Sequence, residues 1–325
     1  MGIKNLNRFL LDNCSEKSIK KQHLGNIKGK PIVVDASIYL YKFQTDELLM
    51  ENMYLLVSIL LQYNILPIFV FDGKPPPEKK ELLTHRHRLK LIAEKQYNEL
   101  KNLTANNPDI SIDEKKEIME ELVQLKKQFV RIRDEDIKNV KSLLDAYGIP
   151  YIDAPGEADQ VCVHMVKTKK AWACLSDDMD MFVYGCPRVI RFISLMQHTA
   201  IFYDMNLILK ELCLSIELFR EIMVLSGTDY NINENTSLEQ TVKWLYKYKK
   251  YCTKEASLDK LSFYDWLHTN TKYIDDYDSL LNVYKMFELD NDMFIEIQNR
   301  VFKKDRTDKS KLHEIMGQYG FVYTD

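Results

Sequence analysis

The stretch FVFDGKPPPEKKELLTHRHR, residues 69–88, holds the pattern that decides the fold. It starts as an apolar run typical of a buried strand and ends that run at a carboxylate, Asp72. Three prolines follow, and then a basic helical pattern places Lys79 and Arg86 seven and fourteen residues after Asp72. An Asp after a single strand is more often a helix cap or a turn residue. The interpretation of Asp72 therefore depends on whether other strands end in the same way.

Five short runs have strand character: PIVVDA (31–36), LPIFVFD (66–72), IPYID (149–153), AWACLSDD (171–178) and RVIRFI (188–193). They do not alternate strictly between apolar and polar residues, which is typical of strands covered on both faces. Helical patterns at 46–64, in a long stretch ending at 147, and at 157–168 separate the first four. This order predicts an α/β fold with a mainly parallel central sheet flanked by helices.

A long insertion lies between the second and third predicted strands. Residues 79–103 have a charged helical pattern, TANNPD (104–109) breaks it, and Ser111 with Glu114 forms an S-x-x-E capping box for a second helix. An apolar stripe from Ile118 to Ile132 follows at helical spacing, and RDED (133–136) precedes a further helix ending at 147. After Asp229 the chain is helical and rich in Lys and Tyr. We therefore divide it into a core of residues 1–230, with an insertion at 79–147, and a helical C-terminal extension at 231–325.

Composition narrows the cellular setting. The 325 residues are 46% hydrophobic and carry a net charge of only −3, so a nucleic-acid partner would need locally clustered Lys and Arg. The six cysteines lie far apart without CxxC spacing, which disfavours a zinc site and suits a reducing compartment. The N-terminus is too polar for a signal peptide, and no run of about 18 apolar residues could span a membrane. We expect an intracellular protein without membrane association.

Acidic residues follow the strands at the end where ligands bind in an open parallel sheet. Asp35 ends the first strand, Asp72 the second, and Asp177 with Asp178 the fourth. GEAD (156–159) follows the third strand at the start of a helix. The expected cluster at this rim comprises Asp35, Asp72, Glu157, Asp159, Asp178, Asp180 and Asp229.

So many carboxylates repel one another when ionised, and divalent cations are the usual compensation. Oxygen donors without His or Cys favour Mg²⁺, with Mn²⁺ as the alternative. Two such ions about 4 Å apart would hold the attacking and leaving oxygens of a phosphodiester. A cap or a turn is the more frequent explanation of any one of these acids, but four acidic strand ends in one sheet favour the metal site.

The basic segment after Asp72 has a matching role. Lys79, Arg86 and Lys90 follow at steps of seven and four and so share one helical face. Arg grips a phosphate bidentately and Lys acts as a point charge, so this face could hold a phosphate near the metals. The alternative is a solvated amphipathic helix.

Taken together, MGIKNL, VVDASIYLY, FVFDGKPP, DAPGEADQ, SDDMDMF and LSGTDY resemble motifs of the flap endonuclease and XPG-type structure-specific 5′ nucleases. The resemblance covers about residues 1–230. It implies a PIN-like 5′ nuclease fold in which 79–147 forms a helical arch and cap. It also implies that Gly2 lies close to DNA and that Tyr41 stacks on the base near the cut.

The resemblance implies a Mg²⁺-dependent DNA phosphodiesterase that uses two ions, with Asp177 a neighbour of the ligands. Lys79, Arg86 and Asp178 would be catalytic, and Lys79, Arg86 and Lys90 would contact DNA. The expected substrate is 5′-flap, gapped or branched DNA in replication, repair or recombination. The alternatives are a processive 5′→3′ exonuclease and a non-catalytic junction-binding protein. We further expect a monomer, nuclear by resemblance, without a recognisable sliding-clamp motif.

Three departures from the family pattern affect substrate choice. Asp35 and Asp72 are only 37 positions apart, which shortens the stretch that builds the 3′-flap pocket. Asp159 stands where flap endonucleases usually carry Glu, as in the 5′-exonuclease branch. The glycine hairpin of the family's helix-hairpin-helix is replaced near Thr236, Ser237 and Leu238. We expect this degenerate hairpin to bind duplex DNA less strongly and to lack potassium.

KWLYKYKKYCTK, residues 243–254, interleaves lysines with aromatic residues. Lys243 and Lys247 would then track a nucleic-acid backbone. The same pattern fits a helix with Trp244, Leu245 and Tyr248 packed inward and the lysines in water. The sequence leaves both interpretations open.

Overall fold

A computed structural model describes residues 3–106, 112–231, 235–254, 261–289 and 294–323. Its centre is a sheet of seven strands in the order β1-β7-β6-β5-β2-β3-β4. The bounds are β1 Ile19–His23, β2 Pro31–Asp35, β3 Leu66–Phe71, β4 Tyr151–Asp153, β5 Ala173–Leu175, β6 Arg188–Ser194 and β7 Thr199–Asp204.

Five neighbouring strands of this sheet are parallel. β2 pairs with β3 and β5, β3 pairs with β4, and β5 pairs with β6, all in parallel. At one edge β7 pairs antiparallel with β6, and β1 pairs antiparallel with β7, so β7 alone among these seven strands runs in the opposite direction. The predicted mainly parallel sheet is confirmed, and the carboxyl ends of β2 to β6 share one rim.

The sheet divides the core into two layers because successive side chains of a strand point to opposite faces. On β2, Val33 belongs to one buried cluster and Val34 to the other. Both are fully buried, so the sheet is covered on both faces as the unalternating strand patterns predict. One face packs against α2 (Ala36–Thr45), α3 (Leu49–Gln62) and α6 (Asp134–Tyr147), and the other against α7 (Ala158–Lys167), α8 (Asp180–Val183) and α10 (Ile216–Leu225). The helices α1 (Leu6–Asn13) and α9 (Met205–Leu212) also join this second layer.

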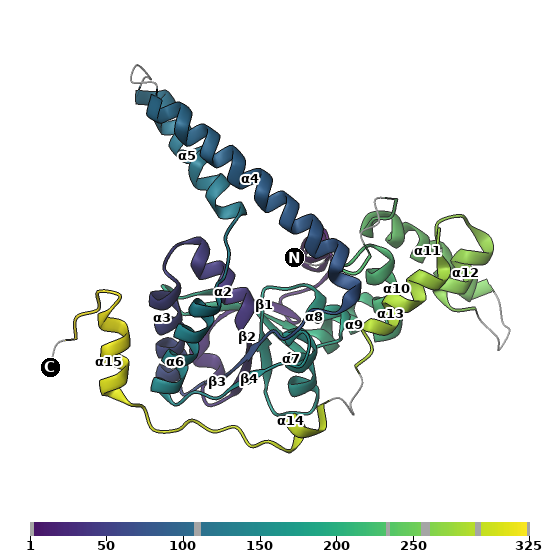
Figure 1. The fold of residues 1–325 in the computed structure, drawn as a ribbon. Coiled ribbons are helices and arrows are strands. Elements are labelled where there is room, and N and C mark those ends of the chain that lie inside the picture. Colours follow the sequence, from purple (N-terminus) through teal and green to yellow (C-terminus); the bar gives the residue numbers. More distant parts are fainter. Residues whose placement is uncertain (1–2, 107–111, 232–234, 255–260, 290–293, 324–325) are drawn as a thin grey trace.

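The insertion rises from the rim as a helical hairpin (Figure 1). A short 3₁₀ turn, η2 (Pro77–Lys79), leads into α4 (Lys80–Asn106), and α5 (Ile112–Gln128) returns beside it. Midway along α4, Glu94 pairs with Arg131 at 2.5 Å, and the rings of Tyr97 and Phe129 lie 5.4 Å apart. We call this hairpin the arch.

The C-terminal residues pack on the second layer and then return across the molecule (Figure 1). The helices α11 (Leu238–Lys254), α12 (Phe263–Asn270) and α13 (Tyr277–Met286) bury Leu245, Phe263 and Leu280 in the same cluster as α7 and α10. After α14 (Ile295–Asn299), an extended segment reaches α15 (Lys309–Gly317), which packs beside α6. On the way, the Asp305 amide donates to the Gly148 carbonyl at 2.8 Å.

Several local expectations need adjustment. The strands β1 and β7 were not expected, and the helical pattern at 46–64 is preceded by a separate helix, α2. The helix α4 runs to Asn106 rather than ending at 103, and α5 stops at Gln128, so Phe129 and Ile132 lie beyond it. The predicted capping box lies outside the described residues, because Ser111 is not among them. No helix within the described ranges is long and apolar enough to cross a bilayer.

Candidate functional site

The carboxyl ends of the parallel strands open into a cavity of about 650 Å³, which we call the rim cavity. Its walls come from the rim on one side and from the base of the arch on the other. Six of the seven predicted acids line it: Asp35, Asp72, Glu157, Asp159, Asp178 and Asp229. The seventh, Asp180, is 1% exposed, and its amide donates to Asp178 Oδ1 at 3.0 Å.

Local structure explains how Asp35 and Asp72 reach the cavity. Asp35 ends β2 and caps α2, accepting the Ile38 amide at Oδ1 (3.4 Å) and the Ser176 hydroxyl at Oδ2 (2.9 Å). Asp72 follows β3 and accepts the Ala158 amide at 2.7 Å. Both acids therefore fulfil the capping alternative as well as facing the cavity. The two roles do not compete, because a carboxylate has several acceptor sites.

Gly73 allows the second and third acidic motifs to meet. Its amide donates to the Gly156 carbonyl at 2.7 Å. A Cβ at this position would lie 2.1 Å from the Ala154 carbonyl oxygen, so any larger residue would push the two loops apart. The glycine therefore brings Asp72 close to Glu157.

Burial and mutual repulsion favour the neutral form of several acids. Burial first, and then the neighbouring Asp72, raise the pKa of Asp35 to about 8. Burial and Asp35 raise the pKa of Asp159, and burial and Asp178 raise the pKa of Asp180. The rim thus holds more negative charge than it can keep ionised without cations.

Two basic residues of the arch base supply part of the opposite charge. Lys79 pairs with Glu157, and Arg86 Nη2 lies 2.7 Å from Asp229 Oδ2. Burial would lower the pKa of Lys79, but the ion pair and hydrogen bond with Glu157 outweigh it and the pKa is raised. Both bases that were predicted to reach a phosphate near the metals therefore lie against acids of the rim.

Lys90 and Tyr41 lie further out along the same cavity. Lys90 Nζ donates to the Val130 carbonyl at 2.9 Å and lies 4.9 Å from the centre of the Tyr41 ring. Burial, and then the nearby Arg131 and Arg86, lower the pKa of Lys90. Tyr41 is 43% exposed, so its ring remains accessible.

The acids fit divalent cations chemically. As they stand, no three His, Cys, Asp or Glu side chains within the described ranges are arranged to hold an ion. Glu157 and Asp229 instead point to the arch bases. Asp180 Oδ1, however, is buried without a hydrogen-bond partner. This carboxylate oxygen is therefore free to coordinate a cation. An all-oxygen set with such an unpaired donor suits a hard cation.

Two other predicted residues, Lys243 and Lys247, do not line the cavity. Gly2 is outside the described residues. On α11, Lys243 pairs with Glu239 at 2.7 Å, and Lys247 Nζ lies 4.0 Å from the centre of the Trp244 ring. Leu245 is buried, with Trp244 half-buried, so the helix packs its apolar side inward and leaves both lysines in solvent.

Sequence reasoning missed Tyr230, the residue after Asp229. Its hydroxyl donates to Glu157 and lies 3.1 Å from the Tyr184 hydroxyl, while Lys79 Nζ lies 4.7 Å from its ring centre. Its place within LSGTDY was the available signal. Lys127 and Gln128 at the end of α5 also line the cavity, and no local pattern indicated them. Asp177 does not line it and pairs with Lys42 at 2.9 Å.

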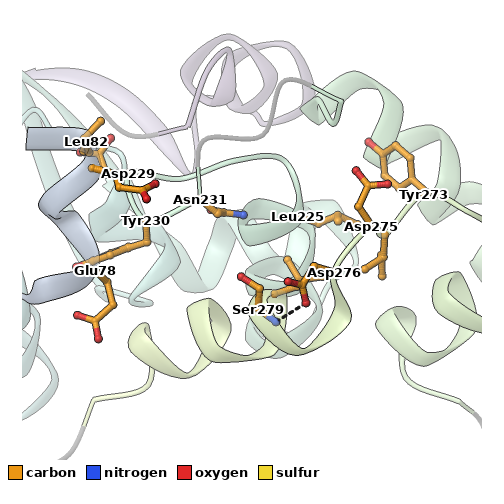
Figure 2. A pocket seen from close by; sticks show the side chains of 13 residues that line it. Glu78, Leu82, Leu225, Asp229, Tyr230, Asn231, Tyr273, Asp275, Asp276 and Ser279 are labelled. Atoms are coloured by element: carbon orange, nitrogen blue, oxygen red, sulfur yellow. Dashed lines mark hydrogen bonds between the residues drawn. The ribbon is translucent and has the colours of Figure 1, made fainter. Parts of the chain in front are cut away.

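A second cavity, of about 320 Å³, lies on the other side of Asp229 and is acidic (Figure 2). Figure 2 shows Asp229 and Tyr230 beside Glu78 of the arch base, with Asp275 and Asp276 at the other end. No Lys or Arg is among the described residues that line it. The lysines and arginine that could contact a polyanion therefore line the rim cavity, whereas the described charged residues of the second cavity are all acids, which repel one.

Two family models match the chain. The XPG N-terminal domain matches residues 1–93, and the XPG I-region matches residues 148–229. The matched segments contain every predicted rim acid. The unmatched residues between them include most of the arch.

Curated relatives carry the name flap endonuclease 1. The protein of Methanococcus aeolicus is 31% identical over 233 residues, covering 66% of this chain and 68% of the relative. The protein of Glycine max is 30% identical over 249 residues, covering 71% of this chain. The chain spans 62% of the length of the soybean relative and 50% of that of Cryptosporidium parvum.

Solved structures share the fold along nearly the whole chain. The catalytic core of Rad2 in complex with DNA substrate matches with a TM-score of 0.68 at 21% identity, covering 98% of this chain and 96% of that one. Flap endonuclease-1 from Methanococcus jannaschii matches with a TM-score of 0.54 at 24% identity, covering 93% and 98%. From the relatives in sequence and the shared fold, the chain belongs to the flap endonuclease and XPG family of 5′ nucleases.

Proposed function

We propose that this protein is a divalent-metal-dependent, structure-specific 5′ nuclease that hydrolyses DNA phosphodiester bonds at 5′ flaps or related branches. The observation that carries this proposal is the rim cavity, where six acids from distant parts of the chain face Lys79, Arg86 and Lys90. Acids alone would repel a phosphate, and bases alone would only bind it. Their combination supports phosphoryl chemistry assisted by cations.

The charge balance suggests how substrate is held. Lys79 and Arg86 now neutralise Glu157 and Asp229. With cations bound, Glu157 and Asp229 would no longer need these two bases as counter-charges, and Lys79 and Arg86 would be available to the scissile phosphate. Arg86 then holds it through two parallel hydrogen bonds and Lys79 through its charge. A bound phosphate would offset part of the cost of separating the two ion pairs, because it would take their place as the partner of both bases.

The acids would hold two cations, Mg²⁺ or Mn²⁺, from Asp35, Asp72, Glu157, Asp159, Asp178, Asp180 and Asp229, directly or through water. When bound, these ions supply a water nucleophile at neutral pH and stabilise the leaving 3′-oxygen. Tyr41, exposed at the cavity wall, would stack on the base beside the scissile phosphate. That contact fixes which phosphate lies opposite the acids.

The remaining expectations extend this proposal. Residues 1–230 would form the nuclease core and 231–325 a helical extension, with Lys243 and Lys247 following duplex backbone and Gly2 close to DNA. Both lysines are exposed on α11, which supports that role. A monomer acting on DNA in the nucleus is the setting that we propose.

Two other functions predict different products. A processive 5′→3′ exonuclease would release mononucleotides, whereas a flap endonuclease releases short oligonucleotides. A non-catalytic junction-binding protein would release nothing, but a scaffold gains nothing from buried, mutually repelling acids such as Asp178 and Asp180.

A 5′-labelled flap substrate with purified protein tests the proposal. We expect short labelled oligonucleotides with Mg²⁺ and none with EDTA. Labelled mononucleotides would favour the exonuclease. Binding without cleavage in Mg²⁺ or Mn²⁺ would leave the junction-binding protein.

A further inference from the structure

Phe192 has a backbone conformation that an aromatic residue rarely adopts. It lies in a bulge of β6, between Arg191 and Ser194, with a φ of 53°. In this left-handed region the Cβ of an L-residue crowds the following carbonyl, so mainly Gly, Asn and Asp occupy it. Strained positions of this kind persist only where the surrounding structure enforces them, and they cluster at functional sites.

The surroundings enforce this one from two sides. The Phe192 amide donates to Asp177 Oδ1 at 2.7 Å. Arg191 is 5% exposed and donates to the Asp177 carbonyl and to Asn7 Oδ1, both at 2.8 Å. Its guanidinium carbon lies 4.5 Å from the centre of the Phe192 ring. The buried guanidinium of Arg191 thus packs against one side of the Phe192 ring. This contact holds the ring in position, and the ring stays partly exposed to solvent.

The conformation exposes the ring rather than hiding it. Phe192 is 43% exposed, the same fraction as Tyr41. Burying a Phe side chain is ordinarily favourable, so strain that keeps one in solvent brings the fold no stability. The ring is therefore available to a partner with an apolar face.

Position links this ring to the rim cavity. Asp177, which holds the Phe192 amide, also pairs with Lys42 at 2.9 Å and precedes Asp178 in the chain. Lys42 in turn follows Tyr41, which lines the cavity. Because β5 and β6 are parallel, the end of β6 lies at the same rim as the acids. Asp177 thus joins Phe192 to Lys42, the chain neighbour of Tyr41, at this rim.

We propose that Phe192 is a second base-stacking platform, which holds one base of the bound DNA outside the rim cavity while Lys42 lies next to it as a positive charge. This inference rests on the proposed function, because it takes nucleic acid as the ligand. An aromatic ring packed against a cation can stack on any nucleobase, so we expect this contact to be independent of DNA sequence.

Substitution by Asn separates a binding role from a structural one. Asn tolerates the left-handed conformation but has no aromatic ring. DNA binding is measured in EDTA by fluorescence anisotropy with a labelled flap substrate, for wild type, Phe192→Asn, Phe192→Tyr and Tyr319→Ala. Tyr319 is a matched exposed aromatic just after α15, where its hydroxyl lies 3.4 Å from Asn139 Nδ2 of α6.

We expect Phe192→Asn to weaken binding about tenfold, the usual scale of a lost base stack. Its thermal midpoint should equal or exceed that of wild type, because strain is relieved. The slope of log affinity against log salt should not change, since no charge is lost. Phe192→Tyr and Tyr319→Ala should bind as wild type.

Wild-type affinity in Phe192→Asn would overturn the platform, and so would a loss of affinity that accompanies a lower thermal midpoint. A 2-aminopurine base placed at successive substrate positions adds a direct readout. At one position, wild type should quench the 2-aminopurine fluorescence and Phe192→Asn should not. Identical quenching by the two proteins at every position would again overturn the stacking role of Phe192. If wild type itself bound no DNA, the proposed function would fall, which is a different result from wild-type binding with an indifferent Phe192.

Discussion

The acid rim and the arch base face each other across one cavity but are built differently. Asp35 ends β2, Asp178 follows β5 and Asp180 begins α8, and these acids are 3%, 7% and 1% exposed. The side chain of Arg86 is 36% exposed, on a helix that projects from the core (Figure 1). The rim is fixed by the sheet, whereas the arch presents its charges from outside. The difference separates two tasks: the rim performs chemistry, and the arch orients what the chemistry acts on.

The largest expected effect comes from the rim. Asp178→Ala should lower the cleavage rate by about a thousandfold or more, because a cation-holding group acts as part of a unit. DNA affinity should persist, since the arch bases and exposed lysines remain. The measurement is single-turnover cleavage of a flap substrate beside anisotropy binding. Cleavage at the wild-type rate would remove Asp178 from the metal site.

The next effect comes from the arch. Arg86→Ala should slow the single-turnover step about a hundredfold, the scale of one lost charge-stabilising contact. Affinity should fall far less. Arg88→Ala is the matched control, because it removes the same charge from an exposed position two residues along α4. Equal losses of rate and affinity for Arg86→Ala would mean that Arg86 only adds binding.

Tyr230 connects the two regions and should have an intermediate effect. Tyr230→Phe keeps the ring against Lys79 but removes the hydroxyl that donates to Glu157. We expect the maximal rate to fall about fivefold, the scale of one hydrogen bond, with KM unchanged. The Mg²⁺ concentration that gives half the maximal rate should also shift, which a purely structural role would not produce. An unchanged Mg²⁺ dependence would separate Tyr230 from the metal site.

The smallest expected effect is on stability. Replacing a rim acid should stabilise the metal-free protein, although it removes a group needed for activity. Asp180→Asn replaces a buried acid, whose pKa is raised by burial and by Asp178, with a neutral side chain of nearly the same shape. In EDTA, the free energy of unfolding should rise by on the order of 1 kcal/mol, because the unfolded chain ionises the acid freely above its ordinary pKa and the buried site does not. Urea unfolding of both proteins at pH 8 measures the change. A less stable Asp180→Asn would show that the rim acids are not in conflict in the metal-free protein.

The sequence predicted the location of those site residues that directly follow a strand, because the end of a strand fixes where its next residue lies in the sheet. Parallel strands share a rim, so Asp35, Asp72 and Asp178 could be brought together from strand ends alone. Edge strand β1 was missed because IKKQH is mostly polar and exposed, and its pairing with β7 is distant in the chain. Nothing local distinguishes such a segment from a loop.

The finer site depends on tertiary contacts that no local pattern encodes. The Arg86–Asp229 ion pair joins residues 143 positions apart. Which acid Arg86 contacts depends on how the arch packs on the core. The φ of Phe192 depends on Asp177 and Arg191, which hold it by a hydrogen bond and a ring contact. Sequence predicted which residues gather at the rim, but not how they are paired there.

The central claim is that the rim acids together hold divalent cations. Titration of the purified protein with Mn²⁺, followed through the electron paramagnetic resonance signal of the free ion, tests it most directly. We predict that wild type binds Mn²⁺ with saturation and that Asp178→Ala loses most of this binding while remaining folded. Equal Mn²⁺ binding by the two proteins, or none by wild type in the presence of DNA, would contradict it.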